Sequence, residues 1–227
     1  MSLRQSAKLF PFRGHVRTVD PAVEPVTPGA LREHLVETVT GLPDAMANGF
    51  IQAAREHIEE ATGLAMINQT WRLVYDCWPA IRDEWWGGVR EGSISMLGGP
   101  SSEVAVALPR YPLGSVDAVS VFATNGDETV IDVAATFDVD IYQKPGRMAL
   151  KFGKTWPIAL RPTNGVQIDY IAGYGASGDD VPQSIKLAVM MMAGHLYTHR
   201  GDGCTAAEAY MASGAASLAG AYKAARL

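Results

Sequence analysis

The stretch EHIEEATGLAMINQTWRLVYD, Glu56 to Asp76, contains the point at which the spacing of the apolar residues changes. Before Gly63 the apolar residues recur at helical spacing, and glycine is a common residue at a helix C-terminus. From Gln69 apolar and polar side chains alternate, as they do in a strand with one buried face. The chain therefore changes from helix to strand here, which predicts an α+β fold.

Two helices are expected before this point. Thr27 and Pro28 open the first, because threonine caps a helix N-terminus and proline fits the first turn. The second starts at Asp44 and has one apolar stripe, made up of Met46, Phe50, Ala53, Ala54, Ile58 and Ala61. Its charged residues are expected largely off that stripe, and these are Arg55, Glu56, Glu59 and Glu60.

The N-terminal residues 1–28 have a different character. They contain four prolines among mixed polar residues, which favours extended backbone over helix. We therefore expect an extended N-terminal arm with little regular structure of its own.

A series of short strands follows the change in spacing. The runs are QTWRLVYD, EVAVAL, VDAVSVF, ETVID, FDVDIY, RMALKF and VQIDYIAGY. Turn residues separate them, and Asn125-Gly126 and Pro145-Gly146 are typical of hairpins. Residues 67–176 are therefore predicted to form a β-rich insertion of about six to eight strands.

Helical spacing returns in the C-terminal part. The run IKLAVMMMAGHLYTHR is apolar on almost every side, so this helix is expected to be buried or packed between partners. The alanine-rich tail reads as a final helix that allows close approach of a neighbour, with breaks at Gly214 or Gly220. The predicted core thus has about four helices, two in residues 29–66 and two in residues 177–227, around the β-rich insertion.

The composition of the chain argues against several classes of protein. The chain has 227 residues, of which 48% are hydrophobic and 19% charged, so it can bury a core. Its net charge of −5 argues against tight binding of nucleic acid, which requires a basic surface. Cys77 and Cys204 are too few for a disulfide framework and are read as free, buried thiols in a reducing compartment. No apolar run has the length of a signal peptide or a membrane span, so we expect a soluble protein made in the cytoplasm.

Two histidines four residues apart, His195 and His199, are the best candidates for metal ligands. They share a helical face, and a metal-dependent hydrolase would use such a pair. The glutamate that a metalloprotease helix carries beside its first histidine is replaced by Leu196. We therefore favour a structural interpretation, in which His199 and Arg200 face the last carbonyl groups of the helix.

Other catalytic patterns are missing from the sequence. The run GYGASGDD lacks the lysine followed by Ser or Thr that ends a phosphate loop, and no G-x-S-x-G sequence is present. Trp71 and Trp156 lie in or beside strand-like runs and are expected in the core. Trp85 and Trp86, in RDEWWGG, are more typical of a protein contact than of a ligand site.

A series of segments resembles one protein family. In order they are LREHLVET with ANGFIQAAREHIEEATGLAMINQTWRL, then LPRYPLGSVDAVSVF, PGRMALKFGKTWP, and VQIDYIAGYG with DDVPQSIKLAVMMMAGHLYTHR. Together they resemble the head–tail connector, or adaptor, proteins of long-tailed bacteriophages and gene transfer agents. The resemblance covers the chain from about residue 27 to the last helix. The N-terminal arm and the segment around Trp85 lie outside it.

The resemblance implies a structural protein of the virion neck, assembled in the host cytoplasm, with no catalytic residue, cofactor or metal. Such adaptors form a ring of about twelve copies below the portal protein, extend the DNA channel without binding DNA specifically, and dock the next neck, stopper or tail protein. Another neck or tail-completion protein is the alternative. The C-terminal region resembles the part that reaches toward the portal. The expected partner-binding residues are Tyr210, Met211, Leu218, Tyr222, Lys223, Arg226, Trp85 and Trp86.

Overall fold

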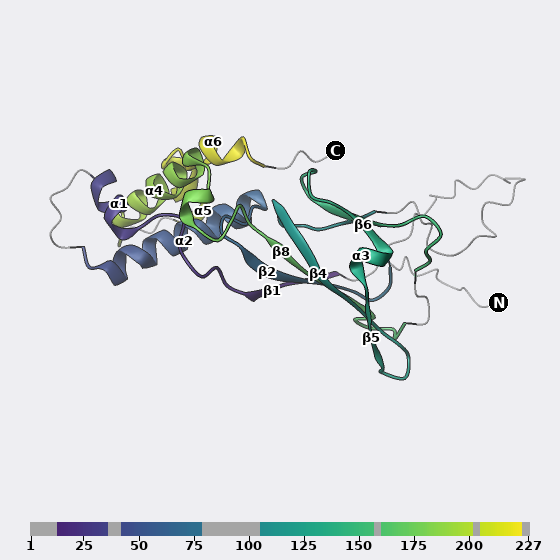
Figure 1. Cartoon of the computed structure of the whole chain (residues 1–227). Coiled ribbons are helices and arrows are strands. Elements are labelled where there is room, and N and C mark those ends of the chain that lie inside the picture. The colour runs from purple at the N-terminus through teal and green to yellow at the C-terminus, as the bar shows by residue number, and fades with distance from the viewer. Residues whose placement is uncertain (1–12, 36–41, 79–104, 157–159, 202–204, 224–227) are drawn as a thin grey trace, which may run out of the picture.

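The fold has a helical part at one end and a β part at the other, as the computed structural model shows (Figure 1). The structure describes residues 13–35, 42–78, 105–156, 160–201 and 205–223. Helices and antiparallel sheets are both present, which confirms the predicted α+β class. Among the described residues, no helix is long and apolar enough to cross a membrane.

Five helices form the helical part: α1 (Pro28–His34), α2 (Asp44–Thr62), α4 (Gln183–Thr198), α5 (Ala206–Ala212) and α6 (Ala215–Gly220). The first two come from the N-terminal region and the other three from the C-terminal region, so the two regions meet in one hydrophobic core. Ile58 and Val189 are fully buried in this core, and Phe50 and Leu196 pack against it. The N-terminal and C-terminal helices thus pack together in one core.

Local sequence explains where these helices begin and end. The hydroxyl of Thr27 accepts a hydrogen bond from the Ala30 N–H at 3.2 Å, as expected of an N-cap. Helix α2 ends at Gly63, whose φ of 86° lies in the left-handed region that favours glycine. Gly214, with φ 78°, separates α5 from α6, which is one of the two breaks predicted in the tail.

The apolar stripe of α2 differs from the predicted one. Its buried apolar residues are Ala47, Ile51, Ala54 and Ile58, whereas Met46 and Ala53 are exposed. The prediction missed Ala47 and Ile51, which lie on the buried side of the helix. Two charged residues predicted to lie off the stripe, Arg55 and Glu59, are also buried, at 2% and 3% exposure. Helix α2 is therefore covered on more than one side.

Two antiparallel sheets form the β part. The strands are β1 (Arg13–Val19), β2 (Gln69–Tyr75), β3 (Val106–Ala107), β4 (Leu113–Phe122), β5 (Glu128–Ile131), β6 (Phe137–Asp140), β7 (Arg147–Leu150) and β8 (Val166–Ala172). The larger sheet has the order β1-β2-β8-β4-β5, and the smaller has the order β3-β7-β6. A short helix α3 (Val133–Thr136) joins β5 to β6, and a 3-10 turn η2 (Gly178–Asp180) precedes α4.

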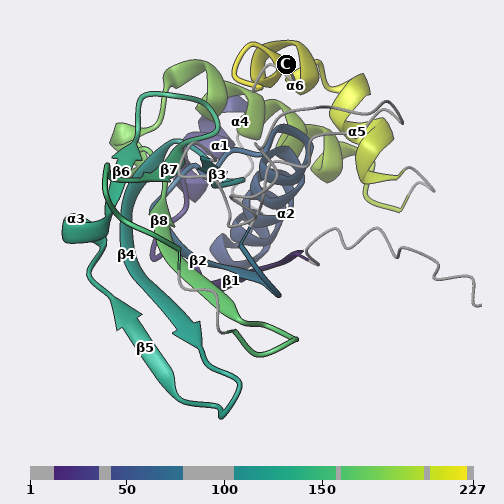
Figure 2. The ribbon, with the colours of Figure 1, turned by 90° about the vertical axis from the view of Figure 1, so that its right-hand side faces the viewer.

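The two sheets share a second hydrophobic core. On β2 and β8 every second side chain is buried, and the register pairs Trp71 with Tyr170 and Leu73 with Ile168. Residues of β3, β6 and β7 pack into the same core, together with the indoles of Trp78 and Trp156. The β4–β5 hairpin projects away from the rest of the molecule (Figure 2).

The N-terminal arm is more ordered than the sequence indicated. Residues 13–19 are extended, but they form strand β1 at the edge of the large sheet, antiparallel to β2. The prolines that suggested an irregular arm lie outside this strand, at positions 11, 21, 25 and 28. The backbone hydrogen bonds of β1 go to β2, a distant segment, so the residues of the arm alone do not predict this strand.

Two smaller predictions have clear outcomes. Asn125-Gly126 turns the β4–β5 hairpin, with Gly126 at φ 93°, and Pro145-Gly146 lies in the turn between β6 and β7. The expectation of buried thiols is wrong for Cys77, which is free but exposed just beyond β2. Cys204 lies outside the described residues.

Candidate interaction site and the polar junction

The C-terminal residues predicted to bind a partner do not share one exposed face. Tyr210, Leu218 and Tyr222 are half-buried and pack against the helical core. Met211 is 69% exposed, and Lys223 is also exposed. The break at Gly214 divides the segment into two short helices, so the spacing of one continuous helix does not apply. Arg226, Trp85 and Trp86 lie outside the described residues.

The alanines of the tail attach it firmly to α4. Ala209, Ala215 and Ala219 are fully buried, and the last two belong to the helical core. The Tyr222 hydroxyl lies 2.7 Å from the Ser184 hydroxyl and so links the end of the tail to the start of α4. Small side chains let the helices approach closely, so the expectation of a loosely attached tail is not supported.

His195 and His199 form the end of α4, as in the structural interpretation. Their rings stack with centroids 4.0 Å apart, and His199 Nδ1 lies 3.0 Å from the His195 carbonyl oxygen. Arg200 donates to the Tyr197 carbonyl at 2.9 Å. The His199 ring and the Arg200 guanidinium thus face the last carbonyl groups of the helix. Within the described ranges, no three His, Cys, Asp or Glu side chains are grouped closely enough to hold a metal ion.

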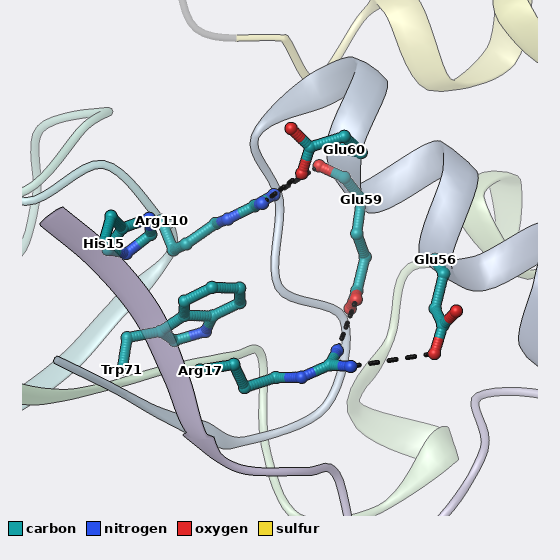
Figure 3. Close-up of a pocket in the computed structure, with 7 residues that line it drawn as sticks. All are labelled: His15, Arg17, Glu56, Glu59, Glu60, Trp71 and Arg110. Atoms are coloured by element: carbon teal, nitrogen blue, oxygen red, sulfur yellow. Dashed lines mark hydrogen bonds and ion pairs between the residues drawn. The ribbon is translucent and has the colours of Figure 1, made fainter.

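The most elaborate polar site lies where the helical part meets the large sheet (Figure 3). It is an open cavity of about 390 Å³ between α2 and the start of the sheet. Its lining comprises His15, Arg17, Glu56, Glu59, Glu60, Trp71 and Arg110. We refer to these residues, with Arg55, Glu24 and Gln69, as the polar junction.

Glu59 is the centre of the polar junction. Its Oε1 accepts hydrogen bonds from the Met66 N–H at 2.8 Å and from Gln69 Nε2 at 2.7 Å. Its Oε2 accepts from Arg55 Nη1 at 3.1 Å and lies 3.9 Å from Arg17 Nη1. Burial raises the pKa of Glu59, while the Met66 N–H and the Arg55 guanidinium act in the opposite direction. This carboxylate joins the last turns of α2 to the segment that leads into β2.

Arg55 connects a third segment to the junction. Its Nε and Nη2 atoms donate to the two carboxylate oxygens of Glu24, at 2.8 and 3.2 Å. Such two-point pairing fixes the orientation of both groups. Residue 24 follows β1, so the guanidinium holds the N-terminal segment against α2. The burial of Arg55 and Glu59 is thus explained by their pairing with each other and with distant segments.

Trp71 provides the floor of the cavity. The His15 ring stacks on its indole with centroids 4.6 Å apart, and the Arg110 guanidinium lies 4.6 Å from the indole centroid. Arg110 also donates to the Glu59 carbonyl and to the Glu60 carboxylate. The charged groups of the cavity therefore bond to one another. The arrangement fixes the joint between two parts of the molecule, and its chemistry is that of a structural ion-pair network.

Sequence reasoning did not find the polar junction. The one local signal was the i, i+4 spacing of Arg55 and Glu59 on a helix, which is also typical of a solvated surface pair. Glu24, the partner of Arg55, is distant in sequence, and Met66, a partner of Glu59, belongs to the loop between α2 and β2. Only the tertiary fold brings these residues together. Trp71 and Trp156, in contrast, were predicted in the core and are found there.

Comparison with known proteins gives a consistent result. The sequence matches no described protein family and no curated protein. A chain in the neck of an empty GTA particle, solved with C6 symmetry, matches with a TM-score of 0.69 and 25% identity, covering 95% of this chain and 97% of that chain. With the same coverage, a chain in the virion of a native gene transfer agent (GTA) particle matches with a TM-score of 0.66 and 25% identity.

A third structure agrees with the first two. A chain in the neck of a native GTA particle, solved with C12 symmetry, has a TM-score of 0.64 and 26% identity over the same fractions of both chains. The similarity therefore includes the helical part and the β part together. This chain has the fold of a neck component of a phage-like particle.

Proposed function

We propose that this protein is a head–tail adaptor of a phage or gene transfer agent. About twelve copies form a ring below the portal, extend the DNA channel, and dock the next neck, stopper or tail protein. The observation that supports this most directly is the similarity over 95% of the chain to components of GTA necks. C6 and C12 symmetry in those necks fits a ring of identical subunits.

The proposed role is structural and does not require enzymatic activity. His195 and His199 cap α4, and the polar junction joins the two parts of the fold. A net charge of −5 suits a channel wall along which DNA slides without being held. A rigid joint between a helical part and a β part suits a subunit that contacts one partner above the ring and another below it.

We place the portal-facing surface on the C-terminal helices. Met211 and Lys223 are the exposed members of the predicted set, and each is available for contact without disturbing the core. Deleting residues 205–227 is a poor test, because it would remove the buried alanines as well. A Met211→Asp/Lys223→Glu double variant tests the surface while leaving the packing on α4 intact.

Co-sedimentation with purified, DNA-filled heads that carry the portal but no neck tests the proposal. We expect the wild-type chain to sediment with these heads in about twelve copies per head, and the double variant to be lost from the pellet. A matched Met46→Asp variant, changed at an exposed methionine of α2, should still bind. Binding only to heads that already carry another adaptor would instead identify a later neck or tail-completion protein.

A further inference from the structure

Two segments of the β part have strongly opposite charge. Residues 117–132 contain Asp117, Asp127, Glu128 and Asp132 and no lysine or arginine. Residues 144–154 contain Lys144, Arg147, Lys151 and Lys154 and no aspartate or glutamate. We call the first the acidic hairpin, since it includes most of β4 and all of β5, and the second the basic segment, since it includes β7 and its two turns.

The two segments do not neutralise each other within one copy. Among the described residues, Arg147 pairs with Asp140 at 3.1 Å, and Lys151 lies 4.0 Å from Asp138. Both of these acids belong to β6, outside the acidic hairpin. No ion pair links the acidic hairpin to the basic segment in the part of the chain that the structure describes. Among the described residues, Lys144 and Lys154 on the basic segment and Glu128 on the acidic hairpin form no ion pair, so their charges are available to another molecule.

Each segment also exposes a large apolar side chain. Phe152, between Lys151 and Lys154 in the turn after β7, is fully exposed. On the acidic hairpin, Val130 is 65% exposed and follows Glu128 on the same face of β5. An exposed apolar side chain surrounded by charges of one sign is typical of a protein contact whose partner has the opposite charge.

Both segments are held in shape before any contact. At the hairpin tip, Asn125 Oδ1 accepts from the Asp127 N–H at 3.2 Å, and Asn125 Nδ2 donates to the Asp127 carboxylate at 2.6 Å. In the turn after β7, the Lys154 N–H donates to the Lys151 carbonyl at 3.1 Å. Contact between preformed surfaces loses little conformational entropy, which favours binding.

We propose that the acidic hairpin of one copy docks on the basic segment of the next copy and so provides a contact around the ring. This inference rests on the proposed ring-forming function. The contact uses two different surfaces of the same chain, so it is head-to-tail, as a ring with more than two subunits requires. Phe152 and Val130 lie at its apolar centre, with Lys154 facing Glu128 across it.

Charge reversal gives a sharp test. In Glu128→Lys, the new lysine faces Lys154 of the next copy, and in Lys154→Glu the new glutamate faces Glu128 of the next copy, so like charges meet at the centre of the contact. Each variant alone should leave about tenfold fewer copies on portal-bearing heads in a co-sedimentation assay at low salt. An equal mixture of the two should recover binding to within about twofold, because opposite charges meet when the variants alternate. Twelve-fold and six-fold rings both have the even number that alternation needs.

The controls separate the possible outcomes. Glu33→Lys changes an exposed glutamate of α1 and should bind as the wild type does. Recovery in the mixture also excludes misfolding of the single variants. If wild-type protein binds heads and both variants bind equally well, the proposed contact is wrong while the function stands. Loss in both variants without recovery in the mixture would assign these segments to a different partner and overturn the contact. Failure of the wild type to bind would count against the proposed function itself.

Discussion

Replacing Glu59 by alanine tests whether the polar junction holds the two parts of the fold together. The change removes the acceptor of the Met66 N–H, of Gln69 Nε2 and of Arg55 Nη1, all in a site where the Glu59 side chain is 4% exposed. Removing one partner of a buried ion pair costs about 3–5 kcal/mol. Arg55 keeps its two hydrogen bonds to Glu24, so we expect a loss of about 3–4 kcal/mol in the free energy of unfolding.

Urea unfolding followed by circular dichroism measures this loss. For a chain of this length, each kcal/mol corresponds to a fall of about 2–4 °C in Tm, so a thermal scan should show a decrease of about 6–16 °C. The neighbouring Glu60→Ala variant is a matched control, because that side chain is 78% exposed and its pair with Arg110 is worth about 1 kcal/mol or less. A Glu59→Ala loss no larger than the Glu60→Ala loss would refute a stabilising role for the junction.

Three further predictions concern other parts of the molecule. Ile58→Ala should lower the free energy of unfolding by about 2–5 kcal/mol in urea titrations, since this side chain is fully buried, and a change near zero would contradict its place in the core. Tyr174→Phe should leave the free energy of unfolding unchanged or slightly higher, because the buried Tyr174 hydroxyl has no hydrogen-bond partner among the described residues and burial raises its pKa to about 12. Tyr111→Phe removes a hydrogen bond to the Thr62 carbonyl and should lower that free energy by about 1 kcal/mol. Hydrogen bonds from the Thr205 N–H and hydroxyl lower the pKa of Glu208, so the capping stabilisation of α5 is present above the ordinary pKa of 4.5 and is lost as the pH falls through the lowered value. Protection of the α5 amides from hydrogen exchange should therefore drop in that pH range in the wild type, and should not depend on pH there in Glu208→Ala.

The sequence was most informative where local periodicity and burial coincide. Alternation from Gln69 onward predicted β2 correctly, because its inward apolar side chains are buried in the core that the two sheets share. Thr27 and Gly63 predicted helix ends because capping depends on a few adjacent residues. Such features need little knowledge of distant parts of the chain.

Features that depend on distant segments were missed. Strand β1 exists because it pairs with β2, more than fifty residues away in sequence. Arg55 and Glu59 are buried because Glu24 and the loop before β2 satisfy their charges. Tyr210, Leu218 and Tyr222 pack against the helical core, a contact with distant helices that the spacing of the tail does not reveal. Periodicity along one segment contains none of this information.

The pairing of β2 with β8 allows most of the β part to vary independently of the helices. The connections of the β part to the helical part lie at one end of the large sheet, since Val19 pairs with Thr70 and Gln69 pairs with Ala172. Directly beyond, the Asn68 N–H donates to the Gly175 carbonyl at 2.9 Å, and a Cβ added to Gly173 would meet Asn68 N at 2.5 Å. Loops at the far end can therefore lengthen, shorten or be exchanged between relatives without rearranging the helices. A lineage could in this way keep one helical part while the loops of the β part change to contact different partners.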